Sequence, residues 1–100
     1  MVSAYEVIEK VAKTGKLKRG INEVTKAIER GEAKLVVAAK DVNPKEIVQH
    51  LEPLCKEKGI KLVWVDEKKK LGIAAGLQVA ASTVAVIDAG EAAKDIELLK

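Results

Sequence analysis

The sequence predicts an α/β domain in which helices cover both faces of a central sheet. Three observations indicate this fold class. Apolar runs typical of strands occur at 34–39, 61–65 and 84–87, amphipathic helical patterns lie between them, and glycine, proline or asparagine separates the segments. The 100 residues are 48% hydrophobic and 33% charged, so we expect residues 1–100 to form one domain around a single core.

The chain is expected to begin with a helix, a minimal strand and a second helix. Apolar residues at helical spacing predict a helix over 4–13, with Ser3 as its N-cap. A short basic segment at 16–18 suits a minimal strand. The second helix is expected to follow Gly20 and to end at Gly31, because glycine favours the backbone conformations found at helix ends.

The middle of the chain predicts two strands joined by one helix. The uninterrupted apolar run at 34–39 is typical of a strand buried on both faces, and 61–65 is read in the same way. Between them, Asn43-Pro44 opens an amphipathic helix that is expected to end at Gly59.

The last third predicts a short helix over 66–76, a strand at 84–87 and a final amphipathic helix after Gly90. Loops at one end of such a layered sheet converge, and loops after strands commonly carry the ligand site. We therefore expect Lys40, Asp41 and Lys68 to lie near the start of the second helix.

That helix start is the most informative part of the sequence. Gly20 lets a ligand approach the main chain, and the helix N-terminus that follows favours anions. Asn22, Glu23 and Lys26 are spaced so that their side chains share one helix face, which suits a polar surface that reads nucleic acid. The alternative is that Asn22 caps the helix while Glu23 and Lys26 form an ordinary solvated ion pair.

Two basic runs and one apolar loop are further candidate features. The runs are Lys16, Lys18 and Arg19, and Lys68, Lys69 and Lys70. They suit either a phosphate-facing edge or two solubilising patches. The apolar loop at 75–81 suits either folded-in core, which the pattern favours slightly, or a surface that stacks on an unpaired base.

Composition excludes several functions. Tyr5 and Trp64 are the only aromatic residues, so RNA binding through several stacking platforms is nearly excluded. His50 and Cys55 are single, so no zinc-ligand spacing exists, and no nucleophile elbow or nucleotide-binding loop occurs. We expect no cofactor, no metal and no catalysis. If the chain were instead a small-molecule enzyme, His50 would be the only obvious candidate for its catalytic group.

Cellular placement follows from other absences. Cys55 falls on an apolar helical stripe and is interpreted as a buried, reduced packing residue. The first 16 residues are charged throughout, and no segment approaches membrane-spanning length. We expect a soluble cytoplasmic protein without a membrane partner.

Several motifs together resemble the ribosomal protein family usually written L-seven-Ae. They are Gly20-x-Asn22-Glu23-x-x-Lys26, the segment 39–44, the segment 71–76 and the loop Leu77-Gln78-Val79. The resemblance spans about residues 4–99 in the same order. It implies a three-layer α/β/α sandwich with a four-stranded mixed sheet. It also implies binding to RNA kink-turns, which are sharply bent internal loops with tandem sheared G·A pairs.

The resemblance implies a role for each candidate residue. Glu23 would accept hydrogen bonds from guanine, and Asn22 and Lys26 would contact guanine acceptors and nearby backbone. Gly20 would let the helix start press against RNA, with Lys18 and Arg19 beside the phosphates. Arg30 and Lys68 would add backbone contacts, and Asp41 would orient the basic residues or accept from RNA. Leu77, Gln78 and Val79 would cover an extruded loop nucleotide.

Departures from the family pattern concern charge. Lys40 and Gln78 stand where acidic residues are frequent, which makes the RNA face more positive. The Asn22-Glu23 pair favours the archaeal-type branch of the family, although the segment 39–41 also resembles the bacterial branch.

The implied partners are ribosomal RNA, box C/D or H/ACA guide RNA, or ribonuclease P RNA, with ribonucleoprotein proteins. The free protein is expected to be a monomer. The alternative function is a protein-interaction module that uses the apolar surface at 77–79.

Overall fold

A mixed four-stranded sheet forms the centre of the computed structural model, which describes residues 3–43 and 45–99. The strands are β1 (Lys16–Arg19), β2 (Leu35–Ala39), β3 (Lys61–Val65) and β4 (Thr83–Asp88). Their spatial order is β1-β4-β2-β3. β2 and β3 pair in parallel, whereas β4 runs antiparallel to both β1 and β2.

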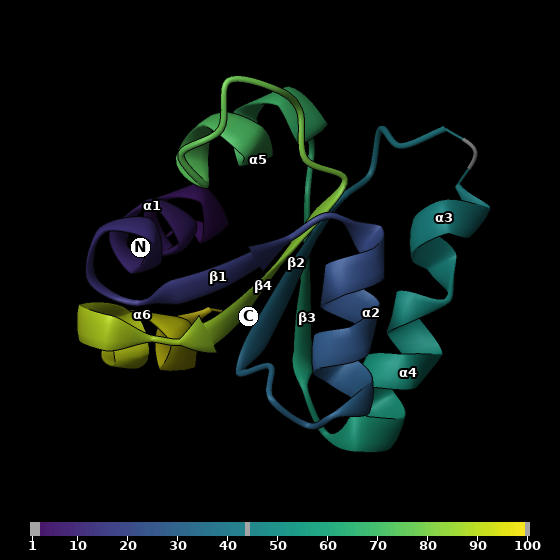
Figure 1. Cartoon of the computed structure of the whole chain (residues 1–100), viewed down its shortest axis with the longest axis horizontal. Helices are drawn as coiled ribbons and strands as arrows, with labels where there is room; N and C mark the ends of the chain where they lie inside the picture. The colour runs from purple at the N-terminus through teal and green to yellow at the C-terminus, as the bar shows by residue number, and fades with distance from the viewer. Residues whose placement is uncertain (1–2, 44, 100) are drawn as a thin grey trace.

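Helices cover both faces of this sheet and make three layers (Figure 1). One face carries α2 (Ile21–Glu29), α3 (Glu46–Gln49) and α4 (Leu51–Lys58). The other face carries α1 (Ala4–Thr14), α5 (Lys68–Ala74), the short 3-10 helix η1 (Gly90–Ala92) and α6 (Ala93–Leu98). The predicted α/β/α sandwich with a four-stranded mixed sheet is therefore confirmed.

The core lies on both sides of β2, whose five residues are all buried. Ile8, Ile28, Leu51 and Leu71 fill the space between this strand and the helices, and none of these four side chains is exposed. The prediction that 61–65 is a fully buried strand is wrong. β3 lies at the edge of the sheet with one neighbouring strand, and four of its five residues are only half-buried.

The single helix predicted from Asn43-Pro44 to Gly59 is divided in two. α3 ends at Gln49 and α4 begins at Leu51. The cause is Pro53, because proline donates no backbone hydrogen bond and its ring clashes with the carbonyl four residues earlier, which belongs to Gln49. Pro44, the predicted start of the helix, lies outside the described residues.

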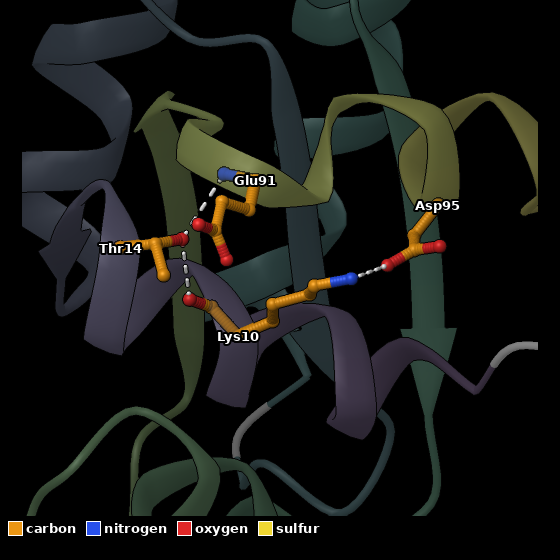
Figure 2. Close-up of polar contacts among 4 residues, drawn as sticks. All are labelled: Lys10, Thr14, Glu91 and Asp95. Atoms are coloured by element: carbon orange, nitrogen blue, oxygen red, sulfur yellow. Dashed lines mark hydrogen bonds and ion pairs between the residues drawn. The ribbon is translucent and has the colours of Figure 1, made fainter.

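A small polar network fastens α1 to the C-terminal segment (Figure 2). Lys10 Nζ lies 3.0 Å from Asp95 Oδ2 on α6. The Thr14 hydroxyl donates to the Lys10 carbonyl at 2.8 Å and accepts from the Glu91 backbone N–H at 3.1 Å. Gly90 lies against the Thr14 carbonyl so closely that a Cβ atom would not fit. These contacts join α1 to η1 and α6, and α1 in turn packs against α5.

Candidate nucleic-acid interface

Strand direction brings most of the candidate residues to one end of the sheet, whereas Arg30, the C-cap of α2, lies at the other end of that helix. Arg19 at the end of β1 pairs with Val84 near the start of β4, and Ala39 at the end of β2 pairs with Val65 at the end of β3. Three strands therefore end where the fourth begins. We call this end the loop edge and define it as segments 19–23, 40–43, 66–69 and 75–82; it lies at the top of Figure 1.

Gly20 holds the start of α2 against the sheet. Its N–H donates to the Thr83 carbonyl at 3.1 Å, and its own carbonyl accepts from the Val24 N–H at 3.0 Å. Gly20 is the N-cap, with φ 88° and ψ 152°, and no side chain caps the helix. The interpretation of Asn22 as the N-cap is therefore wrong, because Asn22 already lies inside the helix.

The polar residues of α2 occupy its solvent face. The opposite face of the helix is buried and consists of Val24, Ala27 and Ile28. The exposed polar residues are Asn22, Glu23, Lys26 and the C-cap residue Arg30. Ion pairs within residues 3–43 and 45–99 join Lys10 to Asp95, Glu9 to Lys13 and Glu67 to Lys70. The predicted Glu23–Lys26 ion pair is not among them, so the Glu23 carboxylate faces solvent as an acceptor.

Asp41 fixes the start of α5. Its Oδ1 accepts a hydrogen bond of 2.8 Å from the Lys68 backbone N–H, and the Lys40 N–H donates to the Val65 carbonyl at 2.9 Å. The exposed basic run at 68–70 thereby has a defined position beside the end of β2. Within the run, the hydrogen bond that the Lys70 ammonium donates to the Glu67 carboxylate raises the pKa of Lys70 above its ordinary value.

The middle of the apolar loop lies on the surface of the protein. Val79 is 68% exposed, Gln78 is exposed and Leu77 is half-buried, whereas Ala75 and Ala81 at the two ends of the segment are buried. The interpretation of 75–81 as folded-in core is therefore correct at its ends and wrong for its middle. The loop lies on α5, because the Leu77 N–H donates to the Gly72 carbonyl at 2.9 Å and the Ala81 N–H donates to the Lys68 carbonyl at 3.0 Å.

Gly72 lies under this loop. A Cβ atom at Gly72 would collide with the Val79 carbonyl, so the glycine admits the loop backbone. The close neighbour of Gly72 is therefore the backbone of the loop.

Arg19 reaches across the loop edge. Its Nε and Nη2 atoms donate to the Ala75 carbonyl at 2.9 and 2.7 Å, and the contact is partly buried. Lys18 is exposed on the edge strand β1. Ile73, which sequence reasoning missed, is 63% exposed on α5. Its exposure could have been predicted from its position, because Ile73 lies off the face of α5 that Leu71 and Ala74 bury.

His50, the candidate catalytic group, has the Thr25 hydroxyl as a hydrogen-bond partner. The Thr25 hydroxyl donates to the Ile21 carbonyl at 2.7 Å, so its oxygen is left to accept from His50 Nε2 at 3.2 Å. His50 itself is exposed. Cys55 is buried as expected, and burial raises the pKa of its thiol to about 11.

Within residues 3–43 and 45–99, no group of three or more His, Cys, Asp or Glu side chains is placed to hold a metal ion. None of the described helices has the length and apolar character needed to span a bilayer.

Comparisons with known proteins concern nearly the whole chain. The family model described as Ribosomal protein L7Ae/L30e/S12e/Gadd45 family matches residues 3–96. A solved structure of the Giardia lamblia 15.5kD RNA binding protein is 34% identical in sequence and superimposes with a TM-score of 0.76. That match covers 82% of this chain and 68% of the Giardia chain. The range 3–96 contains every residue of the loop edge.

Proposed function

The chain belongs to the ribosomal protein L7Ae/L30e/S12e/Gadd45 family, and on that premise we propose that it is a non-catalytic RNA-binding protein that recognises kink-turns. It binds the bent RNA in preference to the extended RNA and so shifts the population toward the bend. One observation carries the proposal: the exposed Asn22, Glu23 and Lys26 begin α2 beside an exposed apolar loop at the same sheet edge.

The chemistry of these three side chains fits a sheared G·A pair. Such a pair leaves much of the guanine edge without a Watson–Crick partner, and this edge offers both N–H donors and acceptors. The Glu23 carboxylate is acceptor-only when ionised and matches the guanine amino or imino groups. The Asn22 amide and the Lys26 ammonium supply donors for guanine acceptors and nearby backbone.

The surrounding residues suit the phosphate backbone. Lys18 and Arg30 are exposed beside the α2 face, and Lys68 is exposed across the loop edge. We propose that these three residues, with Arg19, contact phosphates and supply affinity that depends on salt but not on sequence. Asp41 sets the position of Lys68 through its main-chain hydrogen bond.

The remaining candidates suit close approach and base cover. No heavy atom lies within 4 Å of the position that a Cβ would take at Gly20, so the main chain there is open to RNA. We propose that Leu77, Gln78 and Val79 cover an extruded nucleotide, since a base face packs on apolar side chains such as those of Leu77 and Val79. The proposed RNA is ribosomal RNA, a box C/D or H/ACA guide RNA, or ribonuclease P RNA, since all of these would offer the same motif.

The deciding experiment titrates the protein into two RNAs at physiological salt. One is a short kink-turn, and the other has its tandem G·A pairs converted to Watson–Crick pairs. Kink-turn recognition predicts a specificity ratio of roughly a thousand or more. Equal, weak and salt-sensitive binding to both RNAs would show that the basic residues merely attract phosphate, and would refute the proposal.

A second candidate function is a protein-interaction module on the same fold. The observation that favours it is the exposure of Ile73 and Val79, since exposed apolar side chains are typical of interaction surfaces. Binding to a partner chain that is insensitive to Asn22→Ala and Glu23→Ala, but lost in Val79→Asp, would support this function over RNA recognition.

A further inference from the structure

The Arg19 side chain joins the start of α2 to the end of α5. Arg19 precedes Gly20, the N-cap of α2, and its guanidinium donates two hydrogen bonds to the carbonyl of Ala75. The two residues are 56 positions apart in the sequence. Ala75 is fully buried and ends α5, where carbonyls lack helical partners and carry partial negative charge. The cation therefore satisfies a buried acceptor.

Beyond Ala75 the chain enters the exposed apolar loop, which is attached to α5 at both of its ends. Leu77 bonds to the Gly72 carbonyl, Ala81 bonds to the Lys68 carbonyl, and Gly72 leaves room for the Val79 backbone. Any shift of α5 therefore carries the loop with it. Because Arg19 holds the end of α5, it sets the position of the loop relative to the start of α2.

From this geometry we infer that Arg19 is a positioning residue for RNA recognition. It holds the apolar cover at 77–79 at a fixed separation from Asn22 and Glu23, so that one RNA engages both at once. The inference rests on the proposed function and deepens it. A guanidinium has five N–H donors, so two can serve Ala75 while others face phosphate. Lysine keeps the charge but lacks the planar fork that gives two donors to one carbonyl.

The test compares two variants on two RNAs. Arg19→Lys keeps the charge and removes the fork, and Arg30→Lys makes the same chemical change at the C-cap of α2, the end of that helix away from the loop edge. The RNAs are an intact kink-turn and the same kink-turn with an abasic residue in place of the extruded nucleotide. We expect Arg19→Lys to weaken binding to the intact RNA by about tenfold, with a much smaller loss on the abasic RNA. Arg30→Lys should change both affinities by the same factor.

A double-mutant cycle with Val79→Ala measures the coupling directly. If Arg19 acts through the loop, Val79→Ala should cost less in the Arg19→Lys background than in the wild type. The salt dependence of Arg19→Lys should equal that of the wild type, because its charge is retained. Additive losses, or equal losses of Arg19→Lys on the two RNAs, would overturn the inference and leave Arg19 as a simple phosphate contact.

Hydrogen exchange at the Arg19 Nε–H is measured in the free wild-type protein, so its result does not depend on how a substitution affects folding. The hydrogen bond to Ala75 predicts slower exchange there than at the exposed Arg30, and equally fast exchange at both would overturn the inference. A failure of the proposed function looks different: the wild type itself would fail to discriminate the kink-turn from its Watson–Crick control, whatever Arg19 does.

Discussion

Replacing Gly20 with alanine perturbs the entry to α2 through the backbone alone. Gly20 has φ 88° and ψ 152°, a combination essentially restricted to glycine, which costs other residues about 1–3 kcal/mol. An added Cβ meets no heavy atom within 4 Å, so steric contact adds nothing to this cost. We expect Gly20→Ala to lower the free energy of unfolding by about 1–3 kcal/mol. For a domain of this size, the Tm falls by about 4–8 °C per kcal/mol.

Gly59→Ala is the matched control for this experiment. Gly59 has φ 70° and ψ 29°, has equally open surroundings, and lies at the opposite end of β3 from the loop edge. Its strain costs about 1–2 kcal/mol. Both variants are compared by urea unfolding and by RNA titration. Only Gly20→Ala should weaken kink-turn binding, by about tenfold or ~1.4 kcal/mol, because the strained turn displaces Asn22 and Glu23.

Two results would refute the reasoning about Gly20. If Gly20→Ala were as stable as the wild type, the backbone would not require glycine there. If the two glycine variants lost RNA affinity equally, the loss would follow from general destabilisation and not from the geometry of the α2 start.

The remaining predictions concern charge and protonation. Glu23→Ala should lose about 1–3 kcal/mol of binding to kink-turn RNA in calorimetric titration, and much less on the Watson–Crick control, because its acceptor matches guanine donors; equal losses would contradict that role. Lys68→Ala should weaken binding to both RNAs alike and reduce the salt slope by about 1, and an unchanged slope would remove Lys68 from the phosphate contacts. Burial raises the pKa of Cys55 from 9.0 to about 11, so the folded state holds this proton more tightly and stability should fall as pH rises through that window. Urea unfolding of Cys55→Ala should show a shallower fall between these pH values than the wild type, and superimposable curves would count against the burial effect.

Most of the fold could be predicted because local and global signals agree. β2 is a continuous apolar run and is buried along its whole length. Ser3 is the N-cap of α1, where its hydroxyl accepts from the Glu6 N–H at 3.2 Å. β1 and α5 appear within a few residues of their predicted bounds. In each case the hydrophobic period or the cap residue is itself the cause of the structure.

The errors arise where a distant contact decides. The apolar composition of 61–65 does not reveal that β3 has only one neighbouring strand. Val79 is apolar but exposed, because the backbone of its loop rests on α5 at Gly72. The division at His50 was open to prediction, since Pro53 and its effect on the preceding turn are visible in the sequence.

The sequence predicted the part of the candidate site that depends on local helical spacing, but not the part that depends on a distant contact. Spacing placed Asn22, Glu23 and Lys26 on one exposed helix face, as the structure has them. Spacing alone could not show that Arg19 contacts Ala75, because that pairing depends on how α5 meets β1. Which of these residues touch RNA stays a prediction.

A fixed loop edge is what preference for a bent RNA requires. Discrimination by shape fails if the protein adjusts to either form, so the separation between its contacts must cost free energy to change. Three links resist such a change here: Gly20 to Thr83, Asp41 to the start of α5, and Arg19 to its end. Because these links exist before binding, little ordering of the protein opposes association. Under the proposed function, the binding free energy is then available to hold the RNA bend.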